Sequence, residues 1–200
     1  MLVESVGSSI VIGKLRGGKV KNLVDTYIEK WWLITLAALI EVTASWIRGK
    51  EVPSLWQYTD QYIWLIHLVT YGLLIYVIIY NRKLTGFRFI LFGIILNFIV
   101  IMSNGGRMPV DISGVDPNIY QEKIAMLQSG RDLVHSVLDE STVFGFLGDI
   151  IHLKKPYPLP KALSIGDVFM MIGVFLFIQQ QMLTSKYKIK DVQKHLTSNF

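Results

Sequence analysis

Hydrophobic residues in this chain are gathered into long blocks that short charged segments separate. A helix of about 17–25 mostly apolar residues crosses a bilayer, and four blocks reach or approach that length. They cover about residues 31–47, 62–80, 87–102 and 165–182. Tryptophans and tyrosines mark the ends of the first two blocks, as is usual at the headgroup layer. The pattern predicts an all-α fold, a polytopic transmembrane helical bundle that forms one membrane domain over residues 1–200.

A further apolar segment at residues 2–13 is short for a span and carries Glu4 together with three serines. Such a segment can pack on the bundle, lie in the membrane interface or cross the bilayer completely. We favour a helix packed on the bundle over a surface helix. The predicted number of spans is therefore four, or five if this segment also crosses.

Lysine and arginine residues distinguish the two sides of the predicted membrane. They cluster after residue 13, between the second and third blocks, and in the C-terminal tail. Positive residues accumulate in cytoplasmic loops, so we expect these segments and the C-terminus in the cytoplasm. The loop of residues 103–164 is then extracytoplasmic, and the chain is a multi-pass protein of the cell membrane.

The predicted extracytoplasmic loop contains signals for short structured elements. Asp116-Pro117 is a typical helix start, with an N-cap and a first-turn proline. Apolar residues then recur at roughly helical spacing, with a break near Gly130, so we expect one or two amphipathic helices that lie on the membrane or cap the bundle. The prolines within residues 154–160 exclude regular helix and predict an extended connector to the last span.

Composition agrees with a membrane protein and narrows the range of ligands. Charged residues make up 18% of the chain, against about 25% in soluble domains. The net charge of +5 comes from basic residues that flank apolar blocks, so it does not indicate a nucleic-acid partner. The chain has no cysteine, which excludes disulfides and thiolate metal sites. We predict no metal and no cofactor, and expect membrane lipids, a membrane protein or a lipopeptide as partners.

Four polar residues lie inside the predicted spans, where each is costly in lipid and marks a candidate functional position. They are Glu41, His67, Asn97 and Asp167. At about 1.5 Å of rise per residue, all four fall in the middle-to-outer half of the bilayer. Each has a structural alternative: a protonated glutamate, a packed histidine, an asparagine that joins two helices, and an aspartate that caps a helix with Ser164.

The segment Asn104-Gly105-Gly106-Arg107 follows the third span at the same outer boundary. Its glycines permit positive φ and close backbone approach, and Arg107 can hold a carboxylate or a lipid phosphate. A plain helix C-cap is the structural alternative. Together with Asp149, these residues predict a polar site at the outer membrane face, with the polar residues inside the spans as its deeper wall.

Asp149 and Asp167 are 18 positions apart, with the proline-rich connector between them. If the connector folds back, the two carboxylates face each other at the membrane surface. Two adjacent carboxylates cannot both ionise freely, so the pair would share a proton and activate water against a peptide carbonyl. This pairing is the basis of an enzymatic hypothesis.

Five short motifs along the chain resemble those of a known group of proteins. They are Leu15-Arg16-Gly17-Gly18-Lys19, Trp31-Trp32-Leu33-Ile34, Asn104-Gly105-Gly106-Arg107-Met108-Pro109, Leu147-Gly148-Asp149-Ile150-Ile151 and Ser164-Ile165-Gly166-Asp167-Val168. The similarity, over most of the chain, is to a family of small bacterial multipass membrane proteins of unknown function. It implies a shared fold in the bacterial inner membrane, with the first segment as a fifth span, and it carries no known activity.

A second resemblance is local. The run from Gly145 to His152, which contains Asp149, and the segment Ser164 to Asp167 entering an apolar helix are similar to the catalytic region of the lipoprotein signal peptidases (type II). Those are four-span aspartyl proteases with two catalytic aspartates near the outer membrane face. Asp167 matches the second aspartate, but His152 matches the first. Asp149 stands where asparagine is usual, so the resemblance implies catalysis only if Asp149 takes over the first role.

Two functional hypotheses follow. The first is a non-catalytic sensor, accessory subunit or lipid- or peptide-binding protein, in which the carboxylates cap helices and pair with arginine. The second is a membrane-embedded aspartyl peptidase with Asp149 and Asp167 as the catalytic pair. We favour the first, because one catalytic position departs from the peptidase pattern. The residues expected to line the binding site are Asn104, Gly105, Arg107 and His152, with Glu41, His67 and Asn97 deeper in the bundle.

Overall fold

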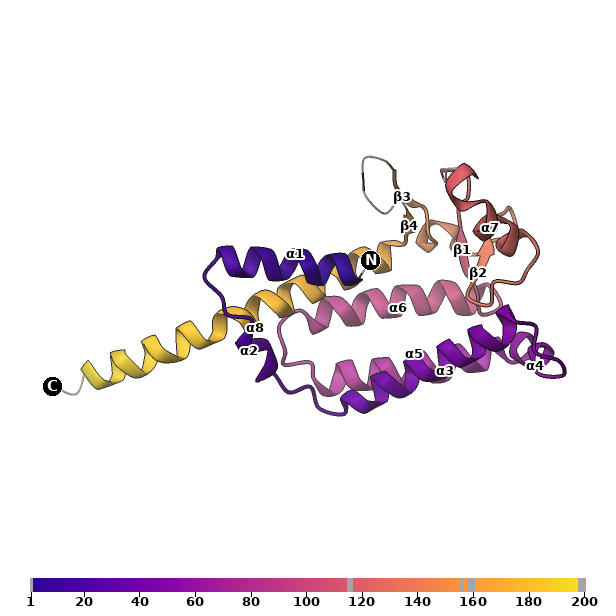
Figure 1. The fold of residues 1–200 in the computed structure, drawn as a ribbon. Coiled ribbons are helices and arrows are strands. Elements are labelled where there is room, and N and C mark those ends of the chain that lie inside the picture. Colours follow the sequence, from indigo (N-terminus) through magenta and orange to yellow (C-terminus); the bar gives the residue numbers. More distant parts are fainter. Residues whose placement is uncertain (1, 115–116, 155–156, 158–160, 198–200) are drawn as a thin grey trace.

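The computed structural model describes residues 2–114, 117–154, 157 and 161–197. Long helices form a bundle, and the short helices and strands between residues 104 and 164 form a cap on it, with α7, β1 and β2 at the upper right in Figure 1 and β3 and β4 above α6. The C-terminal part of the last helix extends beyond the opposite end of the bundle. The cap and this extension of α8 therefore lie on different sides of the bundle.

Five helices of at least 14 residues build the bundle in the described part of the chain. They are α1 (Leu2–Leu15), α3 (Trp31–Gly49), α5 (Ile63–Tyr80), α6 (Phe87–Ser103) and α8 (Ile165–Thr197). Among the described residues, α3, α5 and the Ile165–Thr184 part of α8 are long and apolar enough to cross a membrane, while α6 is apolar but has 17 residues. The four helices predicted from the apolar blocks are confirmed, and three of them have the length and composition of spans.

The core of the bundle lies between α5, α6 and α8. Ile78, Phe87 and Ile94 are buried where α5 and α6 meet, and α8 adds Met170 and Phe177 to the same cluster. Large apolar side chains also remain on the outside of the helices, as expected of a surface that faces lipid. On α3 and α5 these exposed residues include Leu39, Val42, Trp46, Trp64, Leu65 and Leu68.

Helix α1 confirms the helix predicted at residues 2–13 and packs along α8. The Ser5 hydroxyl donates to the Met171 carbonyl (2.9 Å), and the Gln179 amide donates to the Ser9 carbonyl (2.7 Å). The partner numbers rise together, so α1 and α8 run in parallel. Ser5 and Ser9 are buried against α8, whereas Ser8 is exposed and its hydroxyl donates to the Ser5 carbonyl within α1.

Glycines bring α6 and α8 into close antiparallel contact. Gly93 lies against Gly166, and seven residues away on each helix Gly86 lies against Gly173. A side chain at Gly93 or Gly166 would overlap the backbone of the other helix, so only glycine permits this approach. Because Gly173 is level with the start of α6, the rest of α8 continues past α6, where α1 and α2 (Lys21–Val24) cover part of it.

The cap is built from short elements around one central strand. These are α7 (Pro117–Gln128), the single-turn helix η1 (Gly145–Leu147), and the strands β1 (Met108–Val110), β2 (His135–Val137), β3 (Ile151–Leu153) and β4 (Lys161–Leu163). β1 pairs in parallel with β2, and β3 pairs antiparallel with β4. Outside the cap, the short helix α4 (Trp56–Gln61) connects α3 to α5.

The cap corrects the purely α-helical prediction. α7 begins at Pro117 and its last turn is followed by Gly130 at φ +67°, as expected, while Asp116 lies outside the described residues. Of the one or two amphipathic helices expected, α7 is present, and residues 135–137, where a second could have followed, form β2. The predicted connector of residues 154–160 joins β3 to β4, although most of it lies outside the described residues. Three-residue strands are too short to show an alternating pattern, and their partners are distant in sequence.

Candidate functional site

A buried polar cluster joins the start of α8 to α6. The Asp167 N–H donates to Ser164 Oγ (2.9 Å), and the Ser164 N–H donates to Asp167 Oδ2 (3.3 Å). This reciprocal pair is a capping box. The Asn97 side chain completes it: its Nδ2 donates to Asp167 Oδ1 (3.0 Å), and its Oδ1 accepts from Ser164 Oγ (2.8 Å). We refer to Asn97, Ser164 and Asp167 as the closed cluster.

The closed cluster confirms two of the structural alternatives. Asp167 caps α8 together with Ser164, and Asn97 joins two helices. Both Asp167 oxygens accept hydrogen bonds, from Asn97 and from Ser164. Asp167 is 9% exposed and exchanges hydrogen bonds with Ser164 at the start of α8, so its carboxylate is arranged as a buried helix cap.

Asp149 lies in the cap, at the edge of β1 away from β2. Its N–H donates to the Pro109 carbonyl (2.8 Å) and its carbonyl accepts from the Asp111 N–H (3.1 Å). These bonds form an isolated parallel bridge between Val110 and Asp149. The backbone of Asp149 therefore belongs to the cap and that of Asp167 to a span, and a proton shared between their carboxylates stays a prediction.

Tyr71 on α5 packs beside His67. The centroids of the two rings are 6.1 Å apart. His67 is 1% exposed, and its Nδ1 lies 3.4 Å from Glu41 Oε1 on α3. His67 therefore contacts Glu41 on α3 and Tyr71 on its own helix, a tyrosine that the sequence pattern did not single out.

The turn after α6 fastens the cap to the bundle. Asn104 Nδ2 donates to the carbonyls of Val100 (2.7 Å) and Val143 (2.8 Å), and Asn104 Oδ1 accepts from the Val143 N–H (2.9 Å). Gly105 and Gly106 adopt φ of +66° and +86°, which ordinary side chains disfavour. These contacts match the helix C-cap alternative.

His152, the residue at the first catalytic position of the peptidase pattern, is held inside the cap. Its Nε2 lies 2.8 Å from the Asp111 carbonyl oxygen. Its ring packs against Gly114, where a Cβ would overlap it. His152 therefore contacts cap residues in the described part of the chain.

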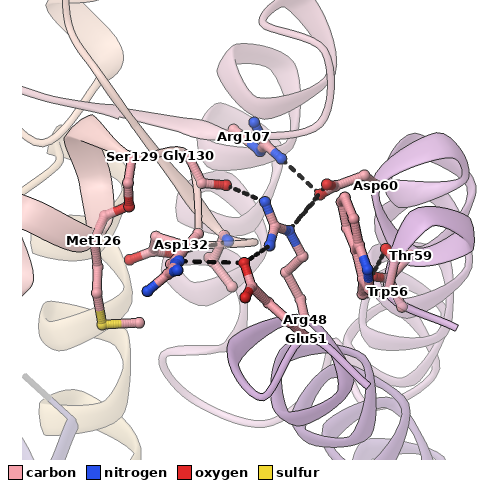
Figure 2. Close-up of polar contacts among 12 residues, drawn as sticks. Arg48, Glu51, Trp56, Thr59, Asp60, Arg107, Met126, Ser129, Gly130 and Asp132 are labelled. Carbon is pink, nitrogen blue, oxygen red and sulfur yellow. Dashed lines mark hydrogen bonds and ion pairs between the residues drawn. The ribbon is translucent and has the colours of Figure 1, made fainter. Parts of the chain in front are cut away.

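A network of arginines and carboxylates lies at the same end of the bundle (Figure 2). Arg48, the last basic residue of α3, is 6% exposed. Its Nε donates to Asp60 on α4 (2.9 Å), and its Nη2 donates to the Gly130 carbonyl after α7 (2.7 Å). Arg107 Nη2 donates to the same Asp60 carboxylate (2.8 Å). Arg107 does pair with a carboxylate, but the carboxylate is Asp60 rather than either predicted aspartate.

Glu51 and Arg131 complete this arginine network, which consists of Arg48, Glu51, Asp60, Arg107 and Arg131. Glu51 Oε1 lies 3.2 Å from Arg131 Nε and 3.7 Å from Arg48 Nη1. The Arg48 guanidinium also lies 4.9 Å from the ring centre of Trp56, a favourable cation–π geometry. Three arginines thus face two carboxylates within the network, which leaves one positive charge in excess.

Two buried nitrogens of the arginine network have no hydrogen-bond acceptor in the described part of the chain. They are Arg48 Nη1 and Arg107 Nε. Buried donors in proteins are nearly always satisfied, so an unsatisfied one calls for an explanation such as an ion or a water. The arginine network therefore has two N–H donors that make no hydrogen bond among the described residues. In the closed cluster, by contrast, both carboxylate oxygens of Asp167 accept hydrogen bonds.

A shallow, open apolar groove lies next to the arginine network. It has a volume of about 430 Å³. Its lining comes from three helices: Leu39, Ile40, Thr43, Ala44 and Ile47 of α3, Thr59 of α4 and Ile66 of α5. Ala44 precedes Arg48 by four residues on α3, and Thr59 precedes Asp60 in the chain. The groove therefore ends beside the arginine network.

Sequence reasoning missed Arg48, Glu51, Asp60 and Arg131 and the groove. No functional role was assigned to the short connection between the first two spans. One signal was present: Asp60 is the single acidic residue among the aromatic residues of 52–62. A lone carboxylate at a membrane boundary needs a cationic partner.

Comparison with known proteins gives one family match. A family model described as "Family of unknown function (DUF5317)" matches residues 25–179. An uncharacterized protein of Thermotoga maritima is 30% identical over 99 residues, which cover 50% of this chain and 54% of that relative. The match thus spans about half the length of the relative. No solved structure matches the chain.

Proposed function

Since the chain belongs to the DUF5317 family, whose function is unknown, we propose a function from its own site: a multi-pass cell-membrane protein that binds an anionic lipid at its extracytoplasmic face without chemical turnover. Three helices of membrane-spanning length support the location. The arginine network supports the ligand.

The proposed topology makes α6 the fourth span. Its 17 residues give a length of about 25 Å, close to the hydrocarbon thickness of about 30 Å. The connection between α5 and α6 carries Arg82 and Lys83, which favours the cytoplasm for that end. The cap, at the other end of α6, is then extracytoplasmic, and the C-terminus of α8 is cytoplasmic.

The unsatisfied donors of Arg48 and Arg107 carry the proposal. Guanidinium groups bind phosphate oxygens through several N–H groups at once. An excess positive charge at this position attracts a phosphate, and the exposed Trp46 and Trp64 support a position of the network near the headgroup level. A lipid phosphate is the anion present at that level in any cell membrane, so it is the ligand that the position favours.

The closed cluster supports a non-catalytic role. A catalytic aspartate must present an oxygen to water or substrate. Both oxygens of Asp167 instead accept hydrogen bonds from neighbouring groups. We therefore place the peptidase hypothesis behind lipid binding.

The test compares two lipids that differ in headgroup charge. The purified protein in detergent is titrated with phosphatidylglycerol or phosphatidylcholine, and bound lipid is counted by native mass spectrometry. We expect phosphatidylglycerol to bind about tenfold more tightly, a difference of about 1.4 kcal/mol. Arg107→Gln should remove most of this preference. Arg88→Gln, an exposed arginine at the other end of α6, is the matched control and should keep it. Equal retention of the two lipids by the unmodified protein would contradict the proposal.

A further inference from the structure

We infer that the groove on α3, α4 and α5 holds one acyl chain of the lipid whose phosphate lies at the arginine network. This inference rests on the proposed function and adds to it: the ligand is a long-chain lipid recognised by its tail as well as by its headgroup. A soluble phosphate compound would then fill only half of the site.

The groove results from the sizes of the side chains on one stripe of α3. Leu39, Ile40, Thr43, Ala44 and Ile47 recur at three- and four-residue intervals, the spacing of one helix face. Thr43 and Ala44 are small, and the larger Leu39, Ile47 and Ile66 border them. From Leu39 to Ile47 the stripe is about 12 Å long at the rise of an α-helix. This length accommodates a stretch of extended hydrocarbon chain.

The outer end of the groove is continuous with the arginine network. Residues four apart on a helix lie on the same face, so Ala44 lies one turn below Arg48. Thr59, on the opposite wall, adjoins Asp60, which both Arg48 and Arg107 contact. The Thr59 hydroxyl donates to the Trp56 carbonyl (2.6 Å), so its hydrogen is used within α4. A ligand that follows the groove outward reaches the arginines directly.

The charge of the arginine network and the apolar lining of the groove together determine which ligand fits the site. The groove is lined almost completely by apolar side chains, and the network at its end carries one excess positive charge. A molecule that complements both parts has a hydrocarbon tail joined to an anionic head. A transmembrane helix of a partner protein would fill the apolar part, but it would complement the network only if it carried a carboxylate at that level. The observations therefore favour a lipid.

The test fills the groove without touching the arginines. Thr43→Phe places a large ring in the groove from an exposed position, and Val42→Phe adds the same ring on the neighbouring exposed position, outside the lining. The ligands are long-chain phosphatidylglycerol and the soluble headgroup compound glycerol 1-phosphate, each measured by native mass spectrometry in detergent. Oligomeric state is measured in parallel by light scattering.

We expect Thr43→Phe to weaken long-chain phosphatidylglycerol binding about tenfold, because the tail loses its apolar contact. Glycerol 1-phosphate binding should not change, and Val42→Phe should bind both ligands like the unmodified protein. Equal phosphatidylglycerol binding by the two variants would overturn the inference. A change of oligomeric state in Thr43→Phe with lipid binding intact would also overturn it, in favour of a protein in the groove. If Arg107→Gln affects neither ligand, it is the proposed function itself that fails.

Discussion

Two polar clusters stabilise this helical bundle, and they differ in how completely their hydrogen-bonding groups are used. In the closed cluster, Asn97, Ser164 and Asp167 satisfy one another between α6 and α8. In the arginine network, Arg48 and Arg107 each keep a buried nitrogen without a hydrogen-bond acceptor among the described residues. Both clusters join helices, but only the second has unused donors.

This difference distinguishes polar residues that stabilise the fold from polar residues that can also bind a ligand. A fully satisfied buried cluster rigidifies a fold and offers nothing to a ligand. A cluster with spare donors and excess charge carries a cost that a bound anion would remove. By this criterion the arginine network, rather than the pair of aspartates, is the candidate binding site.

The largest expected effect concerns the glycine contact beneath the closed cluster. A Cβ at Gly166 would overlap Asn97 Oδ1 and lie 2.7 Å from the Gly93 carbonyl oxygen. Gly166→Val should therefore force α6 and α8 apart and lower the free energy of unfolding by about 4 kcal/mol or more. Thermal unfolding in detergent measures the change. Gly72→Ala is the control, because no atom lies within 4 Å of its added Cβ, and it should unfold at the same temperature or slightly higher.

Removing the central arginine should have the next largest effect. Arg48→Met deletes the donors to Asp60 and to the Gly130 carbonyl from a buried position, which should cost about 3 kcal/mol. Arg131→Met deletes a network arginine whose side chain is 56% exposed, and should cost about 0–1 kcal/mol. Chemical unfolding in detergent compares the two. Similar losses would mean that burial does not set the importance of these arginines.

The helices and the local cap of Ser164 and Asp167 could be predicted from the sequence, but the polar contacts between distant segments could not. The apolar block at 62–80 became α5 at residues 63–80, because span length and hydropathy are local properties. The pairing of Arg107 depended on Asp60, 47 residues earlier, and nothing local specifies such a partner. Asp149 was placed by its backbone bridge to Val110, which required strands too short to recognise.

Substitutions in the capping box should have an intermediate effect on the free energy of unfolding. Asp167→Ala removes the acceptor for the Ser164 N–H and for the Asn97 amide, and should lower the free energy of unfolding by about 2 kcal/mol. Asn97→Ala should show a comparable loss. The double variant should lose less than the sum of the two, because the residues form one network. Strict additivity would mean that the three residues are not a closed unit. Glu140→Ala, an exposed acid of the cap, should change nothing.

The smallest expected effect is a pH dependence of local stability next to the arginine network, which the closed cluster should not share. Burial raises the pKa of the Asp132 carboxyl, but hydrogen bonds from the His135 side chain, the charge of His135 and the N–H groups of Val134 and His135 outweigh it. The pKa is therefore held below its usual 3.8. An acid with a lowered folded-state pKa stabilises the fold fully above the unfolded value, and this contribution is lost as the pH falls through the folded value.

Asp132 lies two residues after Gly130, whose carbonyl accepts from Arg48. Acidification from pH 5 through 3.8 and below should therefore loosen this turn before it affects the start of α8. Hydrogen exchange of the Val134 and Asp167 amides measures the two sites, and only the first should accelerate. Asp132→Asn should remove much of this acceleration, because an amide does not titrate. If both amides accelerate together at low pH, the two clusters open as one cooperative unit, and the distinction between a closed cluster and an open network does not extend to their stability.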